Sequence, residues 1–136
     1  MKKLNPNYIN YESFKENSGS LIPFYINKSF PKSFKLKRFF FLYGKKKFIR
    51  ADHAHTKCDQ ILLPIKGRIE VTTYNKGLRK KFILNEKKSK GIIIPVRTWL
   101  KIKFYKDNDC LLTLCNYKYD KKEYILSFND FLKNYY

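Results

Sequence analysis

Residues 50–60 read Arg-Ala-Asp-His-Ala-His-Thr-Lys-Cys-Asp-Gln, and Gly67 follows seven residues later. His53 and His55 are the only two histidines of the chain. On a β-strand, residues i and i+2 project from the same face, so this spacing predicts that both imidazoles enter one pocket. After Gln60, an apolar run over 61–65 and a Lys-Gly turn predict a second strand. Without these flanking signals, the pair would read as two loop histidines brought together by chance.

Short apolar or alternating segments, separated by turn residues, continue on both sides of this stretch and predict an all-β domain. The predicted strands lie at 21–26, 34–43, 61–65, 68–74, 78–84, 91–95, 100–105 and 110–116, with a hairpin turn at 75–77. Residues 1–20 form a polar N-terminal segment that ends in a turn. Ser127 with Asp130 three residues later predicts a short C-terminal helix over 127–134. About ten strands favour one jelly-roll or closed barrel domain over residues 1–136.

Composition restricts the class of protein and its ligand. The net charge is +19, but the lysines are scattered among apolar residues, as on solvated strand faces, which favours an anionic ligand without identifying it. No apolar run reaches the roughly 18–20 residues of a membrane helix, and no secretory signal is present, so we expect a soluble, cytoplasmic protein. Three cysteines without close pairing also favour a reducing compartment.

The histidine stretch is similar to the first conserved motif of the cupin barrels, with Gln60 where a metal-binding cupin has Glu. In the region of the second motif, Leu100 stands after Trp99 at the position of a histidine ligand. The remaining donors, His53, His55 and a neutral amide, are a weak set for a divalent cation, so we expect no metal. Two histidines without metal favour proton transfer, because imidazole titrates near neutrality. Cys58, three residues after His55, would face away from the pocket on a strand.

Across residues 19–131 the chain resembles the nucleotide-sugar 3,4-ketoisomerases, which are small cupins. The matching stretches are Gly19-Ser20-Leu21, Lys37-Arg38, Arg50, His53-Ala54-His55, Gln60, Gly67, Gly91, Pro95, Trp99, Asp109-Cys110, Tyr119 to Ile125, and Asn129-Asp130-Phe131. The resemblance implies an isomerase without metal or cofactor that converts dTDP-4-keto-6-deoxyglucose into a 3-keto sugar. It also implies a homodimer, in which an N-terminal strand can exchange between subunits. The product would supply a 3-aminotransferase that makes a 3-amino-3,6-dideoxy sugar for a surface glycan.

The chemistry predicts a role for each candidate residue. A ketone at carbon 4 acidifies the hydrogen on carbon 3, and we expect His53 to be the base that removes it, with His55 as a proton shuttle or orienting partner. Arg50 is predicted to bind the enediolate or the diphosphate. Trp99 is either a pocket wall or an ordinary core tryptophan. Further residues predicted to bind substrate are Gln60, Arg38 and Tyr43.

Three departures from the family pattern leave the product configuration at carbon 4 open. Ser18 stands where the family has an arginine, Leu100 where it has a histidine, and Phe40, within Phe39 to Phe41, where it has a tyrosine. Tyr43 or Tyr25 are the candidates to replace that phenol. The alternative is a cupin without catalytic activity that binds a nucleotide sugar or another polyanion through its basic surface. Nucleic acid is the less favoured partner, since the aromatic residues lie in core-like runs rather than between arginines.

Overall fold

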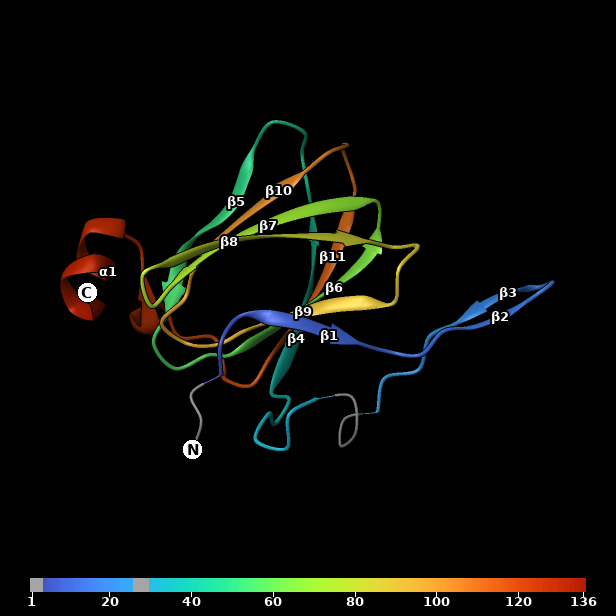
Figure 1. Cartoon of the computed structure of the whole chain (residues 1–136), viewed down its shortest axis with the longest axis horizontal. Helices are drawn as coiled ribbons and strands as arrows, with labels where there is room; N and C mark the ends of the chain where they lie inside the picture. Colours follow the sequence, from blue (N-terminus) through green and yellow to red (C-terminus); the bar gives the residue numbers. More distant parts are fainter. Residues whose placement is uncertain (1–3, 26–29) are drawn as a thin grey trace.

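Two five-stranded antiparallel sheets face each other in the computed structural model, which describes residues 4–25 and 30–136 (Figure 1). The strand orders are β1-β9-β6-β11-β4 and β12-β5-β10-β7-β8, and β2 and β3 form a separate hairpin that stands away from the barrel. The elements are β1 (Asn7–Asn10), β2 (Phe14–Glu16), β3 (Gly19–Leu21), β4 (Arg38–Tyr43), β5 (Ile49–His55), β6 (Gln60–Lys66), β7 (Arg68–Asn75), β8 (Leu78–Asn85), β9 (Lys90–Ile94), β10 (Trp99–Phe104), β11 (Cys110–Cys115), the 3₁₀ helix η1 (Lys121–Glu123), β12 (Tyr124–Ile125) and α1 (Phe128–Tyr135).

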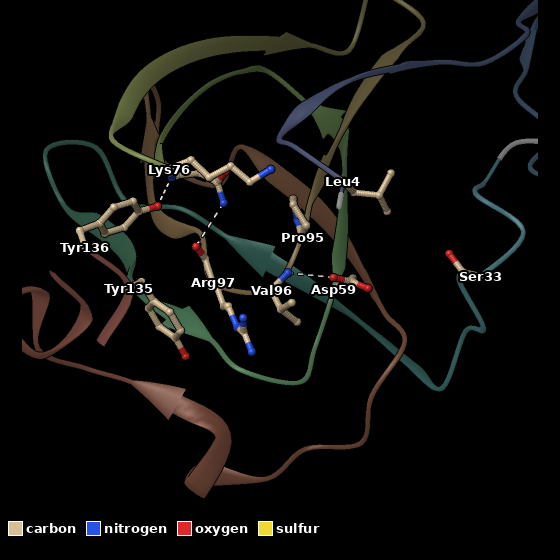
Figure 2. A pocket seen from close by; sticks show the side chains of 10 residues that line it. Leu4, Ser33, Asp59, Lys76, Pro95, Val96, Arg97, Tyr135 and Tyr136 are labelled. Carbon is tan, nitrogen blue, oxygen red and sulfur yellow. Dashed lines mark hydrogen bonds between the residues drawn. The ribbon is translucent and has the colours of Figure 1, made fainter. Parts of the chain in front are cut away.

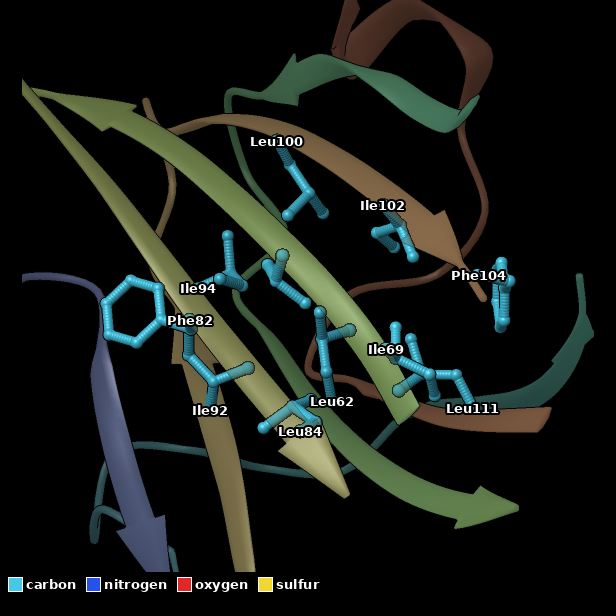
Figure 3. Packing of buried hydrophobic residues seen from close by; sticks show 11 residues of the cluster. Leu62, Ile69, Phe82, Leu84, Ile92, Ile94, Leu100, Ile102, Phe104 and Leu111 are labelled. Carbon is cyan, nitrogen blue, oxygen red and sulfur yellow. The ribbon is translucent and has the colours of Figure 1, made fainter. Parts of the chain in front are cut away.

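The core fills the space between the two sheets (Figure 3). Alternate residues of each strand point inward, so both sheets contribute to one cluster of buried side chains. That cluster comprises Leu62, Ile69, Val71, Phe82, Leu84, Ile92, Ile94, Leu100, Ile102, Phe104 and Leu111. Burying a large apolar side chain contributes about 1.5–3 kcal/mol, so this interior holds the sheets together.

The helix α1 packs on the outer side of the second sheet at one end of its strands (Figure 1). Its N-cap is Ser127, whose hydroxyl accepts a hydrogen bond from the backbone of Asp130. Phe131 is fully buried and packs with Ala54 and Trp99 in a cluster on this outer side. None of the described helices is long and apolar enough to cross a bilayer.

The all-β prediction is confirmed, including the hairpin at 75–77 and the C-terminal helix, which spans Phe128–Tyr135. Two local predictions are wrong. Residues 22–25 do not continue a strand beyond Leu21, and residue 26 lies outside the described part. The strand predicted from Phe34 begins at Arg38, because Phe34 is buried in an irregular segment among other aromatic and aliphatic side chains. The short strands β1, β2, β3 and β12 had no predictive pattern, being two to four residues long.

Candidate active site

A β-bulge in β5 orients both histidines. Ala51 and Asp52 have left-handed backbone φ angles of 66° and 58°. The register with β10 shifts there, so that Leu100 pairs with His53 and Lys101 with Ala51. Leu100 belongs to the interior cluster, which places His53 on the interior face as well. A bulge of this kind re-aims the side chains that follow it.

The outer partner of this bulge is Trp99. Its indole Nε1 donates a hydrogen bond of 3.0 Å to the carboxylate of Asp52. Its ring packs against Phe128 and Phe131 of α1, with centroid separations of 5.2 and 5.6 Å. Trp99 therefore supports the histidine strand from outside the barrel, and it also lines a cavity of about 270 Å³ beside Asp52 and Phe128, away from the histidines.

His53 and His55 form a chain of polar contacts with Glu123. The Nε2 atoms of the two rings lie 3.1 Å apart, and Nδ1 of His55 hydrogen-bonds directly to Oε1 of Glu123. His55 is only 3% exposed and Glu123 2%, whereas His53 is half-buried. Each of these contacts needs one hydrogen between the two atoms, so the three side chains form one hydrogen-bonded chain. His53 is the end of this chain that a ligand can reach.

Glu123 reaches the histidines because η1 and β12 bring it alongside the end of β5, where Tyr124 pairs with His55. Its second oxygen accepts hydrogen bonds from the backbone N–H groups of Thr56 and Lys57, at 3.0 and 3.1 Å. The buried carboxylate is thus fully hydrogen-bonded, as burial of a charge requires. Sequence reasoning gave Glu123 no role, although it lies within the stretch from Tyr119 to Ile125 that carries the resemblance.

Burial sets the protonation of the histidines. It lowers the pKa of His53 to about 4, and the neighbouring His55 adds to this effect, against smaller opposing contributions from Ala51, Glu123 and Asp52. Burial also lowers the pKa of His55, and the hydrogen bond and charge of Glu123 oppose that shift. His53 is consequently a neutral imidazole at neutral pH.

Arg38 forms the opposite wall of this polar region. Its Nε donates to the carbonyl of Tyr117 at 3.3 Å, and its guanidinium lies over the rings of Phe40 and Tyr119. Among the described residues, its Nη2 is buried without a hydrogen-bond partner. Tyr124 completes the wall, with its ring centroid 4.3 Å from that of His55 and 5.0 Å from that of His53.

The prediction that Cys58 faces away from the histidines is wrong, because β5 ends at His55 and Cys58 lies in the turn that follows. Ligand atoms of His55, Cys58 and Glu123 lie within 4.8 Å of one another, a donor set that Zn²⁺ can use. Here, however, the His55 and Glu123 atoms already hydrogen-bond to each other. A hydrogen bond with Cys115, together with burial, raises the pKa of the Cys58 thiol. A metal ion at this position would have to break the hydrogen bond between His55 and Glu123 and displace the proton of the Cys58 thiol.

The other predicted site residues are dispersed. Gln60 is buried in the same interior, and its amide points to Cys115 Sγ at 3.7 Å. Arg50 is exposed on β5 before the bulge. Tyr43 is 64% exposed and lies on the outer face of β4, because strand alternation puts Phe40 and Leu42 inside and Tyr43 outside. Within one chain, the structure thus brings His53, His55, Gln60 and Arg38 together. Arg50 pairs with Ile102 of the interior cluster and so lies on the face of β5 that carries His53, whereas Trp99 and Tyr43 lie on outer faces.

A separate pocket of about 570 Å³ lies at the junction of four inter-strand connections and the C-terminus (Figure 2). It is lined by Leu4, Ser33, Asp59, Asn75, Lys76, Pro95, Val96, Arg97, Tyr135 and Tyr136. The Asp59 carboxylate is occupied by the backbone of Val96 and the side chain of Asn116. Neither histidine lines this pocket, so it is distinct from the site formed by His53, His55 and Glu123.

Comparison with known proteins identifies the family. The family model described as "FdtA: WxcM-like, C-terminal" matches residues 4–135. The TDP-4-oxo-6-deoxy-α-D-glucose-3,4-oxoisomerase of Aneurinibacillus thermoaerophilus is 25% identical over 126 residues, which cover 92% of this chain and 88% of that protein.

Two solved structures from Campylobacter jejuni extend the likeness. A TDP-quinovose 3,4-ketoisomerase is 29% identical with a TM-score of 0.86, covering 96% of this chain and 98% of that one. A TDP-fucose 3,4-ketoisomerase is 28% identical with a TM-score of 0.84, covering 98% and 97%. With its family model matched over nearly the whole chain, the protein belongs to the WxcM-like FdtA family of 3,4-ketoisomerases and is an isomerase with a cupin-like fold.

Proposed function

We propose that this protein converts dTDP-4-keto-6-deoxyglucose into a dTDP-3-keto-6-deoxyhexose. The observation that carries this proposal is the line of contacts from His53 through His55 to Glu123, which ends in a neutral, reachable imidazole. The substrate class is supported by the curated relative, whose name specifies the same TDP-linked keto sugar. A 3-aminotransferase that makes a 3-amino-3,6-dideoxy sugar for a surface glycan is the step that we expect to consume the product.

The proposed reaction moves two protons and leaves the redox state of the sugar as a whole unchanged. His53 takes the proton from carbon 3, and the electron pair forms a carbon 3–carbon 4 double bond with negative charge on the oxygen of carbon 4. Protonation of that oxygen gives an enediol. Loss of the hydroxyl proton at carbon 3 and protonation of carbon 4 then give the 3-keto sugar. General-base help of this kind contributes roughly 100- to 10,000-fold.

The surrounding residues suit this reaction. The unpartnered Nη2 of Arg38 is a buried cationic donor, suited to the developing enediolate oxygen. Glu123 holds the orientation of His55 through Nδ1, leaving its Nε2 to exchange a proton with His53. Arg50, exposed nearer the start of β5, is suited to bind the diphosphate bidentately. These assignments need neither a metal nor an organic cofactor.

Proton NMR of dTDP-4-keto-6-deoxyglucose in deuterated buffer tests the proposal. We expect loss of the carbon 3 hydrogen signal and growth of 3-keto sugar signals with the purified protein. His53→Asn should abolish both changes while its far-UV circular dichroism stays that of the unaltered protein. Full turnover by His53→Asn would disprove the assignment of the base. No change with the unaltered protein would leave the alternative, a cupin that only binds a nucleotide sugar or polyanion.

We further infer a homodimer that works in a reducing, cytoplasmic compartment. The hairpin β2–β3 carries exposed apolar side chains, with Phe14 52% and Leu21 66% exposed, and it stands away from the barrel (Figure 1). Such a hairpin is suited to pack on a second copy or to exchange with it. The cysteines are free thiols and buried, which suits a reducing environment.

A further inference from the structure

The buried end of the histidine chain carries three side chains of the kinds that bind zinc. Ligand atoms of His55, Cys58 and Glu123 lie within 4.8 Å of one another, and all three residues are buried. Among residues 4–25 and 30–136, this is the only group of three or more histidine, cysteine or acidic side chains with that geometry. Imidazole, thiolate and carboxylate are the three donor types of protein zinc sites, and three protein ligands suffice where a fourth position stays open.

The segment between β5 and β6 brings the thiol to the other two groups. Cys58 lies in this segment, and the backbone N–H groups of Thr56 and Lys57, in the same segment, hold Glu123. Zn²⁺ binds nitrogen and oxygen at about 2.0–2.2 Å and sulfur at about 2.3 Å, so tetrahedral ligand atoms stand roughly 3.3–3.7 Å apart. His55 and Glu123 are joined by a hydrogen bond and must separate to admit an ion. That change displaces a turn and the end of the 3₁₀ helix η1, and it leaves the ladder hydrogen bonds of the barrel in place.

The donor set selects a thiophilic ion over a hard one. Mg²⁺ and Ca²⁺ prefer oxygen ligands, whereas Zn²⁺ bonds well to thiolate and imidazole. The guanidinium of Arg38 acts electrostatically on His55, so an ion held by charge alone is disfavoured here. Coordination deprotonates a thiol outright, so each ion that binds releases one proton from Cys58.

An ion at this position interrupts proton exchange between the two histidines. In the metal-free protein, Glu123 contacts Nδ1 of His55, and Nε2 of His55 lies 3.1 Å from Nε2 of His53. A neutral imidazole carries one hydrogen, so a metal on Nδ1 fixes that hydrogen on Nε2. His55 then has no lone pair with which to take a proton from His53.

We propose that Zn²⁺ binds to His55, Cys58 and Glu123 and inhibits the isomerase. The binding is independent of the reaction, whereas the inhibition rests on the proposed function. The ion takes no part in the chemistry of the sugar. It removes Glu123 from His55 and holds His55 in a form that cannot exchange a proton with His53. Cys58 is a free thiol, which is the form that a metal ion needs.

Titration of the full chain, without an affinity tag, with Cd²⁺ tests the site. Cd²⁺ replaces Zn²⁺ at thiolate sites and gives an ultraviolet absorption band when it bonds to sulfur. We compare the unaltered protein with Cys58→Ser and with the matched control Cys110→Ser. Cys110 is a buried thiol at the start of β11, where it pairs with Tyr43, whereas Cys58 contacts Cys115 at the other end of that strand.

The unaltered protein and Cys110→Ser should each bind one Cd²⁺ with a thiolate band. Cys58→Ser should lose the band and bind more weakly by over 100-fold, since outer partners of a metal alone are worth roughly 10- to 100-fold. Ring ¹⁵N NMR of the unaltered protein, which needs no variant, should identify Nδ1 of His55 as the metal-bound nitrogen.

Isomerisation of dTDP-4-keto-6-deoxyglucose, followed by proton NMR, tests the inhibition. Zn²⁺ should abolish product formation by the unaltered protein and by Cys110→Ser, a chelator should restore it, and Mg²⁺ should have no effect. Cys58→Ser should keep its activity at the same Zn²⁺ concentration, because Cys58 takes no part in the reaction. That comparison also separates inhibition at the protein from binding of Zn²⁺ to the diphosphate of the substrate.

Thermal unfolding checks that the variants are folded and reports binding as well, because a ligand of the folded state raises the unfolding temperature. Cd²⁺ should raise it for the unaltered protein and for Cys110→Ser. No thiolate band in the unaltered protein, or an equal band in Cys58→Ser, would overturn the zinc site. Faster isomerisation with Zn²⁺, or equal inhibition of Cys58→Ser, would overturn the inhibitory role. A protein that binds Cd²⁺ through Cys58 but does not isomerise without metal would fail the proposed function, and the inhibition with it, while the site stands.

Discussion

At the scale of single residues, the decisive property is the low pKa of His53. Burial brings it to about 4 from an ordinary value of 6.5. A base must be neutral to accept a proton, so kcat/KM should stay nearly constant from neutral pH down to about pH 5. A pH-rate profile with the dTDP keto sugar measures this directly. Half of the activity lost near pH 6.5 would mean that His53 is not the base, or that it is solvated in the working enzyme.

The lowered pKa of His53 also predicts how the free energy of unfolding depends on pH. Between pH 6.5 and about 4, the unfolded chain binds a proton at position 53 that the folded chain does not. The contribution of neutral His53 to stability is therefore complete above pH 6.5 and is lost as the pH falls toward 4. Urea unfolding at several pH values should show this decline in the unaltered protein and a flatter curve in His53→Asn. If the stability of the unaltered protein and of His53→Asn changed with pH in the same way, His53 would be solvated in the folded protein.

At the scale of elements, the bulge in β5 combines function with backbone strain. Ala51 and Asp52 adopt left-handed conformations that cost a non-glycine residue about 1 kcal/mol or more each. Ala51→Gly should relieve that strain and raise the free energy of unfolding by about 1 kcal/mol with activity retained. Ala54→Gly is the matched control, because Ala54 is fully buried after the bulge and should lose stability as glycine. Lower stability of Ala51→Gly in urea unfolding would contradict a strained bulge.

The bulge in β5 is a feature that the sequence did not predict. Alternation predicted that His53 and His55 share a face, and the register confirms a common interior environment for them. Arg50 is an odd number of residues from His53, yet it pairs with Ile102 just as His53 pairs with Leu100, because the bulge inserts one residue. No local pattern indicates such an insertion. Nor could periodicity find Glu123, which meets His55 across 68 residues of chain.

Side-chain direction explains the remaining differences. Alternation over 100–105 predicted the strand β10, and the run ending at Tyr43 predicted the strand β4, but a continuous apolar run such as Phe39 to Phe41 does not reveal which residues face inward. The structure turns Phe40 inward, and Phe39 and Tyr43 outward. Trp99 likewise reads equally well as pocket or core from sequence. Its position was decided by α1, whose aromatic face needs a partner on the outer sheet surface.

At the scale of the whole molecule, the exposed apolar face of β4 predicts self-association. This strand lies at the edge of its sheet, and Phe39, Phe41 and Tyr43 on its outer face are 60%, 51% and 64% exposed. An exposed aromatic row on an edge strand is a recurrent feature of interaction surfaces. Its outward direction means that a charge there leaves the inner core untouched. We therefore expect Phe41→Glu to separate the subunits without unfolding them.

Light scattering coupled to size exclusion tests this dimer. The unaltered protein should have twice the chain mass of 16.5 kDa, and Phe41→Glu should have the mass of one chain. Leu78→Glu is the matched control, because Leu78 is 62% exposed at the start of β8 and should leave the dimer intact. Since the net charge of +19 makes two copies repel, added salt should favour the dimer by screening that repulsion. A single-chain mass for the unaltered protein at high protein and salt concentration would refute self-association, and the exposed aromatic row would then need a different partner.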